Sequence, residues 1–405
     1  MDLKLANFVK KLFYSYYVAD FSAHKMPSEI KKREFGFVSF DGSMMRHMSF
    51  NATEELTTFI KNFVPKDAYF SCAYYENPTE EMDRKDWLGA DLIFDIDADH
   101  IPTTCEKIHD KWTCKNCGFS GKGVTPEKCP LCAGEKIDAE TWPCEVCLNS
   151  AKSETIKLLD MLQSDFGFSR NEMQVFFSGH RGYHVHVECE VVKSLDSTAR
   201  KEIADYVSSI GIEASFHLVG KSSKGKITYG NGLLFNCGWP KRLAEGIQTF
   251  LSGAKEEDLR ELGFRKKIIT ALMEKSDKIL KSDLKGVGPK TWEKLVKHVI
   301  ASQSVKIDTV VTTDIHRLIR IPETLNSRTG FKKAEVPIST IDKFEPFRDA
   351  IAFRKGSVKV RVSDAPEFRI NDETFGPYRD RKIELPVAAA LLLVCRGRAE
   401  VLNGV

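Results

Sequence analysis

The chain has 405 residues, with 60 basic and 57 acidic side chains that leave a formal net charge of +3. Hydrophobic residues make up 42% and charged residues 29%, a composition typical of globular proteins and too apolar for a disordered chain. The overall charge gives no sign of a nucleic-acid binder, so any basic footprint must be local, as in the lysines between Lys281 and Lys297. The apolar run at 385–395 is too short to span a membrane, and residues 1–21 are typical of an amphipathic helix rather than a signal peptide. We therefore expect an intracellular protein, cytoplasmic or nuclear, without a membrane anchor.

Helical and strand-like patterns alternate along the chain. After the N-terminal helix, the elements predicted before the cysteine-rich segment are strands at 35–40 and 44–50, a capped helix at 51–63, and strands at 69–75 and 90–96. Those predicted after it are a helix at 153–166, strands at 174–177 and 183–188, a helix at 198–208, a charged helical region at 240–303, a strand at 358–362 and a helix at 386–395. This order predicts an α/β (α+β) fold with two inserted modules.

One short motif lies inside the helical region. The sequence from Leu284 to Trp292, LKGVGPKTW, resembles the turn of a helix–hairpin–helix, whose backbone amides can bind a phosphate. An ordinary turn between two helices is the alternative interpretation.

Seven of the 11 cysteines fall between Cys105 and Cys147. Their clustering in CxxC pairs, without a secretory signal, favours metal binding in a reducing compartment over disulfides. Two such pairs can surround one tetrahedral zinc ion, and the remaining cysteines and a histidine can close a second site. The inner set is Cys114, Cys117, Cys129 and Cys132, and the outer set is Cys105, His109, Cys144 and Cys147. Other partitions of these ligands, and an iron–sulfur cluster, are alternatives.

An apolar strand at 90–99 ends in alternating aspartates. Because residues i and i+2 of a strand point to the same face, Asp95 and Asp97 are expected to project side by side. Such a carboxylate pair repels itself unless a cation lies between its members, and hard oxygen ligands suit Mg²⁺ or Mn²⁺. Asp99 on the same face is an alternative second ligand, and a solvated acidic loop is the alternative to a metal site.

The sequence SGHRGYHVHV begins at Ser178 and lies between two predicted strands. Its two glycines allow a tight turn that brings backbone amides close to a ligand. Ser178, Arg181 and His184 would then offer a hydroxyl, a guanidinium and an imidazole to a triphosphate. A hairpin turn with exposed histidines is the alternative.

Together these motifs resemble the catalytic small subunit of the archaeal and eukaryotic DNA primases. The aspartate pair, the SGxRGxH pattern and a late segment at 307–322 occur in the order found in that family, and KREFGF at 32–37 also resembles a family stretch. The resemblance implies that Asp95, Asp97 and Asp308 hold the catalytic cations, with Asp314 as the alternative third carboxylate. It also implies a nucleotide-binding set of Ser178, His180, Arg181, His184 and Arg320, with Asn326 where some relatives carry a histidine.

The resemblance further implies an organisation and a function. The primase catalytic core is expected at 1–104, 148–239 and 304–405, with a zinc-binding insertion at 105–147 and a helical insertion at 240–303. The outer ligand set resembles the family's zinc site, whereas the inner ribbon is an addition to it. We expect a nucleotidyltransferase that makes short RNA or DNA primers from nucleoside triphosphates on single-stranded DNA, in an archaeal type of cell, with a primase large subunit as partner. The alternatives are a repair or translesion polymerase of the primase–polymerase type and an inactive zinc-ribbon scaffold that binds nucleic acid.

Overall fold

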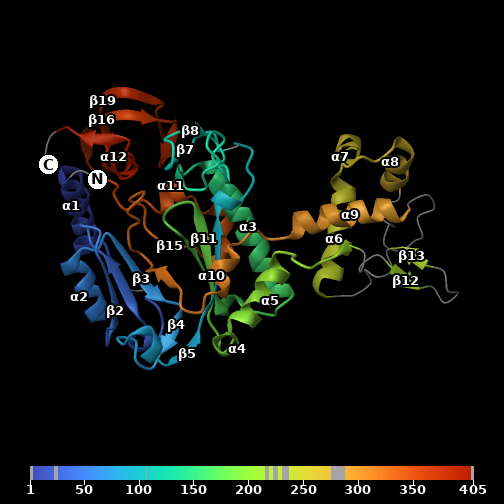
Figure 1. The fold of residues 1–405 in the computed structure, drawn as a ribbon, viewed down its shortest axis with the longest axis horizontal. Helices are drawn as coiled ribbons and strands as arrows, with labels where there is room; N and C mark the ends of the chain where they lie inside the picture. The colour runs from blue at the N-terminus through green and yellow to red at the C-terminus, as the bar shows by residue number, and fades with distance from the viewer. Residues whose placement is uncertain are drawn as a thin grey trace. The chain divides into compact units, whose positions relative to one another are not determined.

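The computed structural model describes residues 3–21, 26–105, 107–214, 219–221, 227–229, 237–274 and 288–402. They form two compact units (Figure 1). The first comprises residues 1–155, 170–201 and 307–405, and the second comprises 156–169 and 202–306. Among the described residues, no helix is both long and apolar enough to cross a membrane.

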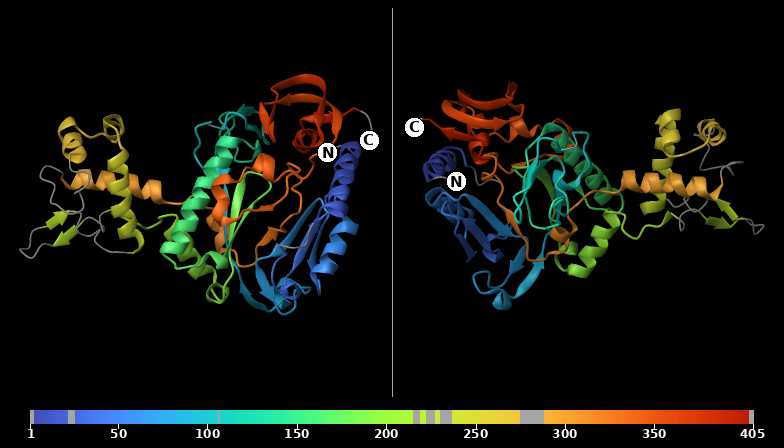
Figure 2. Two further views of the ribbon diagram at one scale, coloured as in Figure 1. Left: turned by 180° about the vertical axis from the view of Figure 1, so that it is seen from behind. Right: turned by 45° about the horizontal axis from the view of Figure 1, so that its top comes forward.

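Two antiparallel four-stranded sheets form the centre of the first unit. The first sheet has the strand order β14 (Leu318–Arg320), β3 (Asp67–Ser71), β1 (Phe35–Val38) and β2 (Met44–Met48). The second has the order β15 (Ala334–Glu335), β10 (Met173–Phe177), β11 (Gly182–Val187) and β6 (Leu92–Asp97). Helices α1 (Leu3–Ala19) and α2 (Thr53–Phe63) lie beside the first sheet in Figure 1 and in the views of Figure 2. The ring of Phe59 on α2 lies 4.7 Å from that of Phe37 on β1, so aromatic packing holds this helix on the sheet.

Smaller elements surround these sheets. The hairpin of β4 (Ala73–Tyr75) and β5 (Trp87–Ala90) follows β3 and precedes β6 in the sequence, and α10 (Thr309–Thr313) packs on β6. The C-terminal sheet has the order β19 (Tyr378–Pro386), β16 (Ser357–Ala365) and β20 (Ala399–Val401), and α12 (Val387–Cys395) packs on it. Other described elements of the first unit are α4 (Glu190–Lys193), α11 (Pro346–Asp349), β17 (Phe368–Ile370), β18 (Glu373–Phe375) and short 3₁₀ turns at Ile30–Lys32, Met82–Arg84, Ala98–His100, Arg170–Glu172 and Ile338–Lys343.

The cysteine-rich segment forms a three-stranded ribbon of β8 (Ser120–Lys122), β7 (Lys111–Cys114) and β9 (Ile137–Glu140). Ion pairs connect it to the C-terminal sheet region. Arg398 contacts Glu140 of the ribbon at 3.0 Å and Asp364 of β16 at 3.1 Å. Charged contacts therefore hold the ribbon beside the C-terminal sheet within the first unit.

The second unit contains α6 (Gly238–Gly253), α7 (Glu256–Glu261), α8 (Lys266–Met273), α9 (Pro289–Gln303) and the hairpin of β12 (Val219–Lys221) and β13 (Ile227–Tyr229). Helices α3 (Glu145–Ser164) and α5 (Ser197–Val207) each have residues in both units. Arg242 of α6 contacts Asp165 at 2.6 Å and Asp160 at 2.9 Å, which links this helix to the end of α3. The unit is broader than the helical insertion expected at 240–303, and residues 284–287 of the helix–hairpin–helix candidate lie outside the described residues.

The mixed α/β fold agrees with the class predicted from the sequence, but two predicted strands are divided. The run at 69–75 breaks at Cys72, so that β3 joins the first sheet and β4 pairs with β5. The cause is Arg33, whose buried guanidinium donates to the carbonyl oxygens of Ser71 at 2.9 Å and Cys72 at 3.2 Å. The same guanidinium pairs with buried Asp91 at 2.8 Å, where the predicted strand at 90–96 is also interrupted.

Candidate active site

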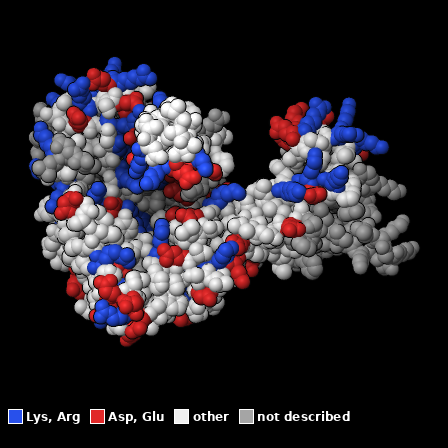
Figure 3. All heavy atoms as spheres, viewed as in Figure 1, with Lys and Arg blue, Asp and Glu red and all other residues white. Residues whose placement is uncertain are grey.

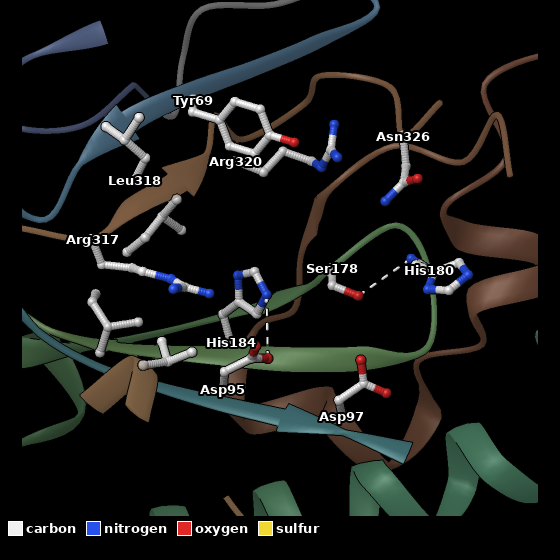
Figure 4. A pocket seen from close by; sticks show the side chains of 13 residues that line it. Tyr69, Asp95, Asp97, Ser178, His180, His184, Arg317, Leu318, Arg320 and Asn326 are labelled. Atoms are coloured by element: carbon white, nitrogen blue, oxygen red, sulfur yellow. Dashed lines mark hydrogen bonds and ion pairs between the residues drawn. The ribbon is translucent and has the colours of Figure 1, made fainter. Parts of the chain in front are cut away.

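The aspartate pair lies on one face of β6. Strand β6 pairs antiparallel with β11, which places Asp95 opposite His184 and Asp97 opposite Gly182. The alternate residues Phe94 and Ile96 are fully buried in the core, whereas both aspartates line a pocket. The side-by-side projection predicted from strand periodicity is therefore present (Figure 4).

This pocket lies in the first unit, with side chains from both central sheets around it (Figure 4). It is lined by Tyr69, Ile93, Asp95, Asp97, Ser178, His180, His184, Val311, Arg317, Leu318, Ile319, Arg320 and Asn326. Its wall on the β14 side is basic, because Arg317 and Arg320 face the aspartates across it. Figure 3 shows lysine and arginine side chains gathered in the hollow at the centre of the first unit.

Asp95 and His184, which lie opposite each other on β6 and β11, both have shifted pKa values. Burial, together with the neighbouring charges of Asp97 and Asp308, raises the pKa of Asp95 to about 7, although Arg317 and Lys333 act in the other direction. Burial and nearby cationic side chains hold the pKa of His184 well below its usual range, so its imidazole is neutral. The Nε2 atom of His184 lies 3.5 Å from Oδ1 of Asp95, and its buried Nδ1 atom has no hydrogen-bond partner in the described structure.

Arg320 is held in place by three contacts. Its guanidinium lies 2.7 Å from Asp67, donates to the carbonyl oxygen of Leu325 at 3.0 Å, and lies 5.3 Å from the centre of the Tyr69 ring. These contacts fix a cation at the pocket wall before any ligand arrives.

The third carboxylate is brought to the pair by α10. The backbone N–H of Asp308 donates to the carbonyl oxygen of Asp95 at 2.8 Å, and its side chain caps α10 by accepting from the N–H of Val310 at 2.9 Å. Asp314 lies at the other end of α10, where its carboxylate accepts from the N–H of His316 at 2.9 Å. Neither Asp308 nor Asp314 is among the residues that line the pocket, but the charge of Asp308 is one of those that raise the pKa of Asp95. The geometry thus favours Asp308 over Asp314.

The turn between β10 and β11 is as tight as the glycines predict. Gly179 has φ +81°, and a Cβ on Gly182 would lie 2.2 Å from the carbonyl oxygen of Ile96. The Oγ atom of Ser178 accepts from the N–H groups of His180 at 3.3 Å and Gly182 at 3.2 Å. The turn therefore presents Ser178 and His180 to the pocket in a fixed arrangement.

Arg181 is the predicted nucleotide ligand that the structure does not bring into the pocket. Its side chain is completely buried and pairs with Asp99 at 2.7 Å and Asp110 at 2.9 Å. These carboxylates already neutralise the guanidinium, so its position differs from the one expected beside Ser178 and His184. Asp99, the alternative metal ligand, is likewise engaged with Arg181 and does not line the pocket.

Two basic or aromatic pocket residues were missed by the sequence reasoning. Arg317 lies in the segment used for the resemblance, three residues before Arg320, and could have been noticed as its second basic residue. Tyr69 had no chemical signal, because a tyrosine in a strand is usually a packing residue.

The cysteine and histidine ligands separate into the two predicted sets of four. In the outer set, Sγ of Cys105 lies 3.4 Å from Nε2 of His109 and 3.5 Å from Sγ of Cys147. In the inner set, the Cys114–Cys132 and Cys117–Cys129 pairs have Sγ atoms 3.6 and 3.7 Å apart. Thiolates at the corners of a tetrahedron about 2.3 Å from a zinc ion lie about 3.8 Å from one another. The spacing in each set therefore fits one zinc ion per set.

Comparison with known proteins identifies the family. Residues 136–338 match the model described as DNA primase small subunit. Among relatives named "DNA primase small subunit PriS", that of Nitrosopumilus maritimus is 30% identical over 98% of both chains. The relative from Cenarchaeum symbiosum is 32% identical over 96% of both chains, and that from Archaeoglobus fulgidus is 34% identical over 97% of both. The chain therefore belongs to the DNA primase small-subunit family, and DNA primase is its enzymatic activity.

Proposed function

We propose that the pocket is a nucleotidyl-transfer site in which Asp95, Asp97 and Asp308 hold two divalent cations, Mg²⁺ or Mn²⁺. The observation that carries this proposal is the shared face of Asp95 and Asp97 on β6, opposite the basic wall of Arg317 and Arg320. One wall suits hard cations and the other suits the phosphates that such cations bridge.

The carboxylates fit this role chemically. The pKa of Asp95 is raised by burial and by its acidic neighbours, which means that the ionised group is not neutralised by the cationic side chains around it. A divalent cation would relieve that repulsion. When bound, the ions would lower the pKa of the attacking 3′-hydroxyl and stabilise the pyrophosphate leaving group.

The basic wall and the β10–β11 turn would hold the triphosphate. Arg320 is fixed by Asp67, and neutral His184 has an unpartnered ring nitrogen, so both can contact phosphate without rearrangement of their supports. Ser178 and His180 line the same pocket, and Arg317 adds a second guanidinium. Because phosphoryl transfer requires mainly positioning and charge neutralisation, such a set can supply much of the rate.

We also propose one structural zinc ion in each Cys/His set. Both sets lie in the segment 105–147, which we retain as a zinc-binding insertion beside a catalytic core at 1–104, 148–239 and 304–405. The helical insertion at 240–303 remains a proposal of the same kind. A closed tetrahedral shell in each set leaves no position for a reacting water, as expected of structural zinc.

The relatives' name describes them as small subunits, which supports a primase large subunit as the partner of this chain. We propose single-stranded DNA as template and nucleoside triphosphates as substrates, inside an archaeal type of cell. The preference for ribonucleotides, with short RNA primers as product, is part of the same proposal.

Nucleotide incorporation on single-stranded DNA tests the site. Asp97→Asn should abolish incorporation at saturating Mg²⁺ or Mn²⁺, because one cation ligand is lost. Asp138→Asn is a matched control on the ribbon, where the carboxylate is exposed and lies 3.8 Å from Lys115. Incorporation by Asp97→Asn at the rate of the control would contradict the site, and absence of incorporation by the unmodified chain would favour the scaffold alternative.

A further inference from the structure

The guanidinium of Arg181 is buried and contacts three polar side chains. Its Nη1 atom is 2.7 Å from Oδ1 of Asp99 and 2.9 Å from Oδ2 of Asp110, and its Nη2 atom donates to Sγ of Cys147 at 3.7 Å. Cys147 is a member of the outer ligand set. One side chain of the β10–β11 turn therefore contacts a ligand of the proposed outer zinc site directly.

Asp110 makes a second connection to the same set. Its Oδ1 atom lies 2.7 Å from Nδ1 of His109 and accepts from the backbone N–H of Trp142 at 2.8 Å. The other ring nitrogen of His109 faces the thiols of Cys105 at 3.4 Å and Cys147 at 3.6 Å. Metal-binding histidines commonly have their second nitrogen oriented by a carboxylate, and here that carboxylate also binds Arg181.

The backbone of Arg181 fixes the turn on its other side. Its carbonyl oxygen accepts from the N–H of Ala98 at 3.1 Å, directly after the aspartate strand β6. Three residues before it, Ser178 lines the pocket and its Oγ atom holds the amides of the turn. Arg181 thus connects the outer ligand set, the end of β6 and the turn that faces the pocket.

We infer that Arg181 is a positioning residue, and that the outer Cys₃His set, loaded with zinc, orders the β10–β11 turn for nucleotide binding through Asp110 and Arg181. This inference rests on the proposed role of the turn in holding a triphosphate. A buried cation between two carboxylates is strongly destabilised when one of them is lost, so Asp110 holds the guanidinium of Arg181 in this position. Loss of the outer zinc would release His109, and with it the orientation of Asp110 and Arg181.

The test compares Asp110→Asn with the surface control Asp138→Asn. Asp110→Asn keeps the shape of the side chain but places an amide nitrogen or a neutral oxygen against the guanidinium. We expect the Kd for a non-hydrolysable nucleoside triphosphate to rise about tenfold, or about 1.4 kcal/mol, with no change for Asp138→Asn. Zinc content and folding are measured on each variant, and His184→Ala is included as a pocket residue that touches the nucleotide in the proposed site.

Amide hydrogen exchange on the unmodified chain provides a readout that does not depend on a variant's folding. Chelation of zinc should accelerate exchange of the amides of His180 and Gly182, while those of β1 and β3 remain protected. If exchange in the turn is unchanged after the outer zinc is lost, the inference is overturned.

The binding results distinguish a failure of this inference from a failure of the proposed nucleotide site. A raised Kd in both Asp110→Asn and His184→Ala supports the inference. A raised Kd in His184→Ala alone overturns it while leaving the nucleotide pocket in place, and Arg181→Ala would then be expected to have no effect. If neither variant binds the triphosphate more weakly, the proposed nucleotide site itself is wrong.

Discussion

Replacing Asp95 by asparagine should abolish synthesis and at the same time stabilise the fold. The carboxyl of Asp95 is partly buried, with 26% of its side chain exposed, and lies near Asp97 and Asp308; these surroundings raise its pKa from 3.8 to about 7. In a chain without catalytic cations, the ionised carboxylate therefore destabilises the fold through desolvation and charge repulsion, and an asparagine side chain would not. The substitution should thus lower activity and raise stability, whereas most substitutions lower stability.

The size of the gain follows from the pKa. The difference between 3.8 and about 7 corresponds to about 4 kcal/mol against the charged form. Relaxation of the site reduces this value, and we expect a gain of about 1–3 kcal/mol above pH 7. Because the folded-state pKa of this acid is raised, the penalty is absent well below pH 3.8, grows as the pH rises toward 7, and is complete above it.

Thermal unfolding at pH 5 and pH 8, without added Mg²⁺ or Mn²⁺ and without a chelator that would remove zinc, measures this gain. The midpoint of Asp95→Asn should exceed that of the unmodified chain by a few degrees at pH 8, and by less at pH 5. Adding Mn²⁺ should stabilise the unmodified chain by binding and leave the variant unchanged. Asp138→Asn, on the exposed ribbon surface, should change neither midpoint.

Two results would refute this reasoning. If Asp95→Asn unfolds at a lower temperature than the unmodified chain at pH 8, the carboxylate is not held against repulsion. If the Asp95→Asn variant retains near-normal synthesis at saturating Mg²⁺ and Mn²⁺, Asp95 is not a ligand of the catalytic cations.

Three further outcomes are expected. Asp308→Asn should abolish incorporation as fully as Asp95→Asn, whereas Asp314→Asn should retain it, because Asp308 is hydrogen-bonded to the backbone of Asp95 and Asp314 lies at the other end of α10. If Asp314→Asn is instead the inactive variant in a synthesis assay, Asp314 and not Asp308 is the third carboxylate. Arg320→Ala should weaken binding of a nucleoside triphosphate by about one to two decades and that of a monophosphate much less, as measured by equilibrium titration, and equal losses would place Arg320 away from the β and γ phosphates. Elemental analysis should find two zinc ions per chain, and chelation should loosen the segment 105–147 before the aspartate strand. A single zinc ion, or iron with visible absorbance, would contradict that assignment.

The parts of the site that sequence reasoning predicted are those set by short-range geometry. The alternation of Asp95 and Asp97 with buried Phe94 and Ile96 follows from the two-residue period of a strand. The division of the cysteines likewise follows from pairs whose members are separated by two other residues, and from a ribbon that folds back on itself. Both kinds of pattern leave few alternative arrangements.

The direction of Arg181 could not be predicted in this way. Its side chain turns from the pocket because Asp110, 71 residues earlier in the chain, and Asp99 offer it carboxylates. A motif read alone gives the composition of a turn, but the partner of each side chain depends on contacts made by distant segments. The same limit applies to Asp314, which lies close to Asp308 in sequence but at the opposite end of α10.

The predicted bounds of helices and strands were wrong where tertiary contacts override the local sequence pattern. Strand β19 was not predicted, because Tyr378–Pro386 carries mostly charged, exposed residues and gains its order from pairing with β16. The strand predicted at 69–75 is divided by Arg33, a residue whose buried role has no local signal. The fold class was nevertheless predictable, because it depends on the order of elements rather than on their ends.

Primer synthesis on circular single-stranded DNA tests the central claim most directly, since this template offers no 3′ end to extend. With γ-phosphate-labelled nucleoside triphosphates, label remains only on a nucleotide that begins a new strand. We predict short labelled strands from the chain, assayed alone and with the proposed large subunit, and none when the chain carries Asp97→Asn. Extension of an annealed primer without any labelled strand, even with the large subunit present, would contradict a primase and favour a polymerase of the repair type.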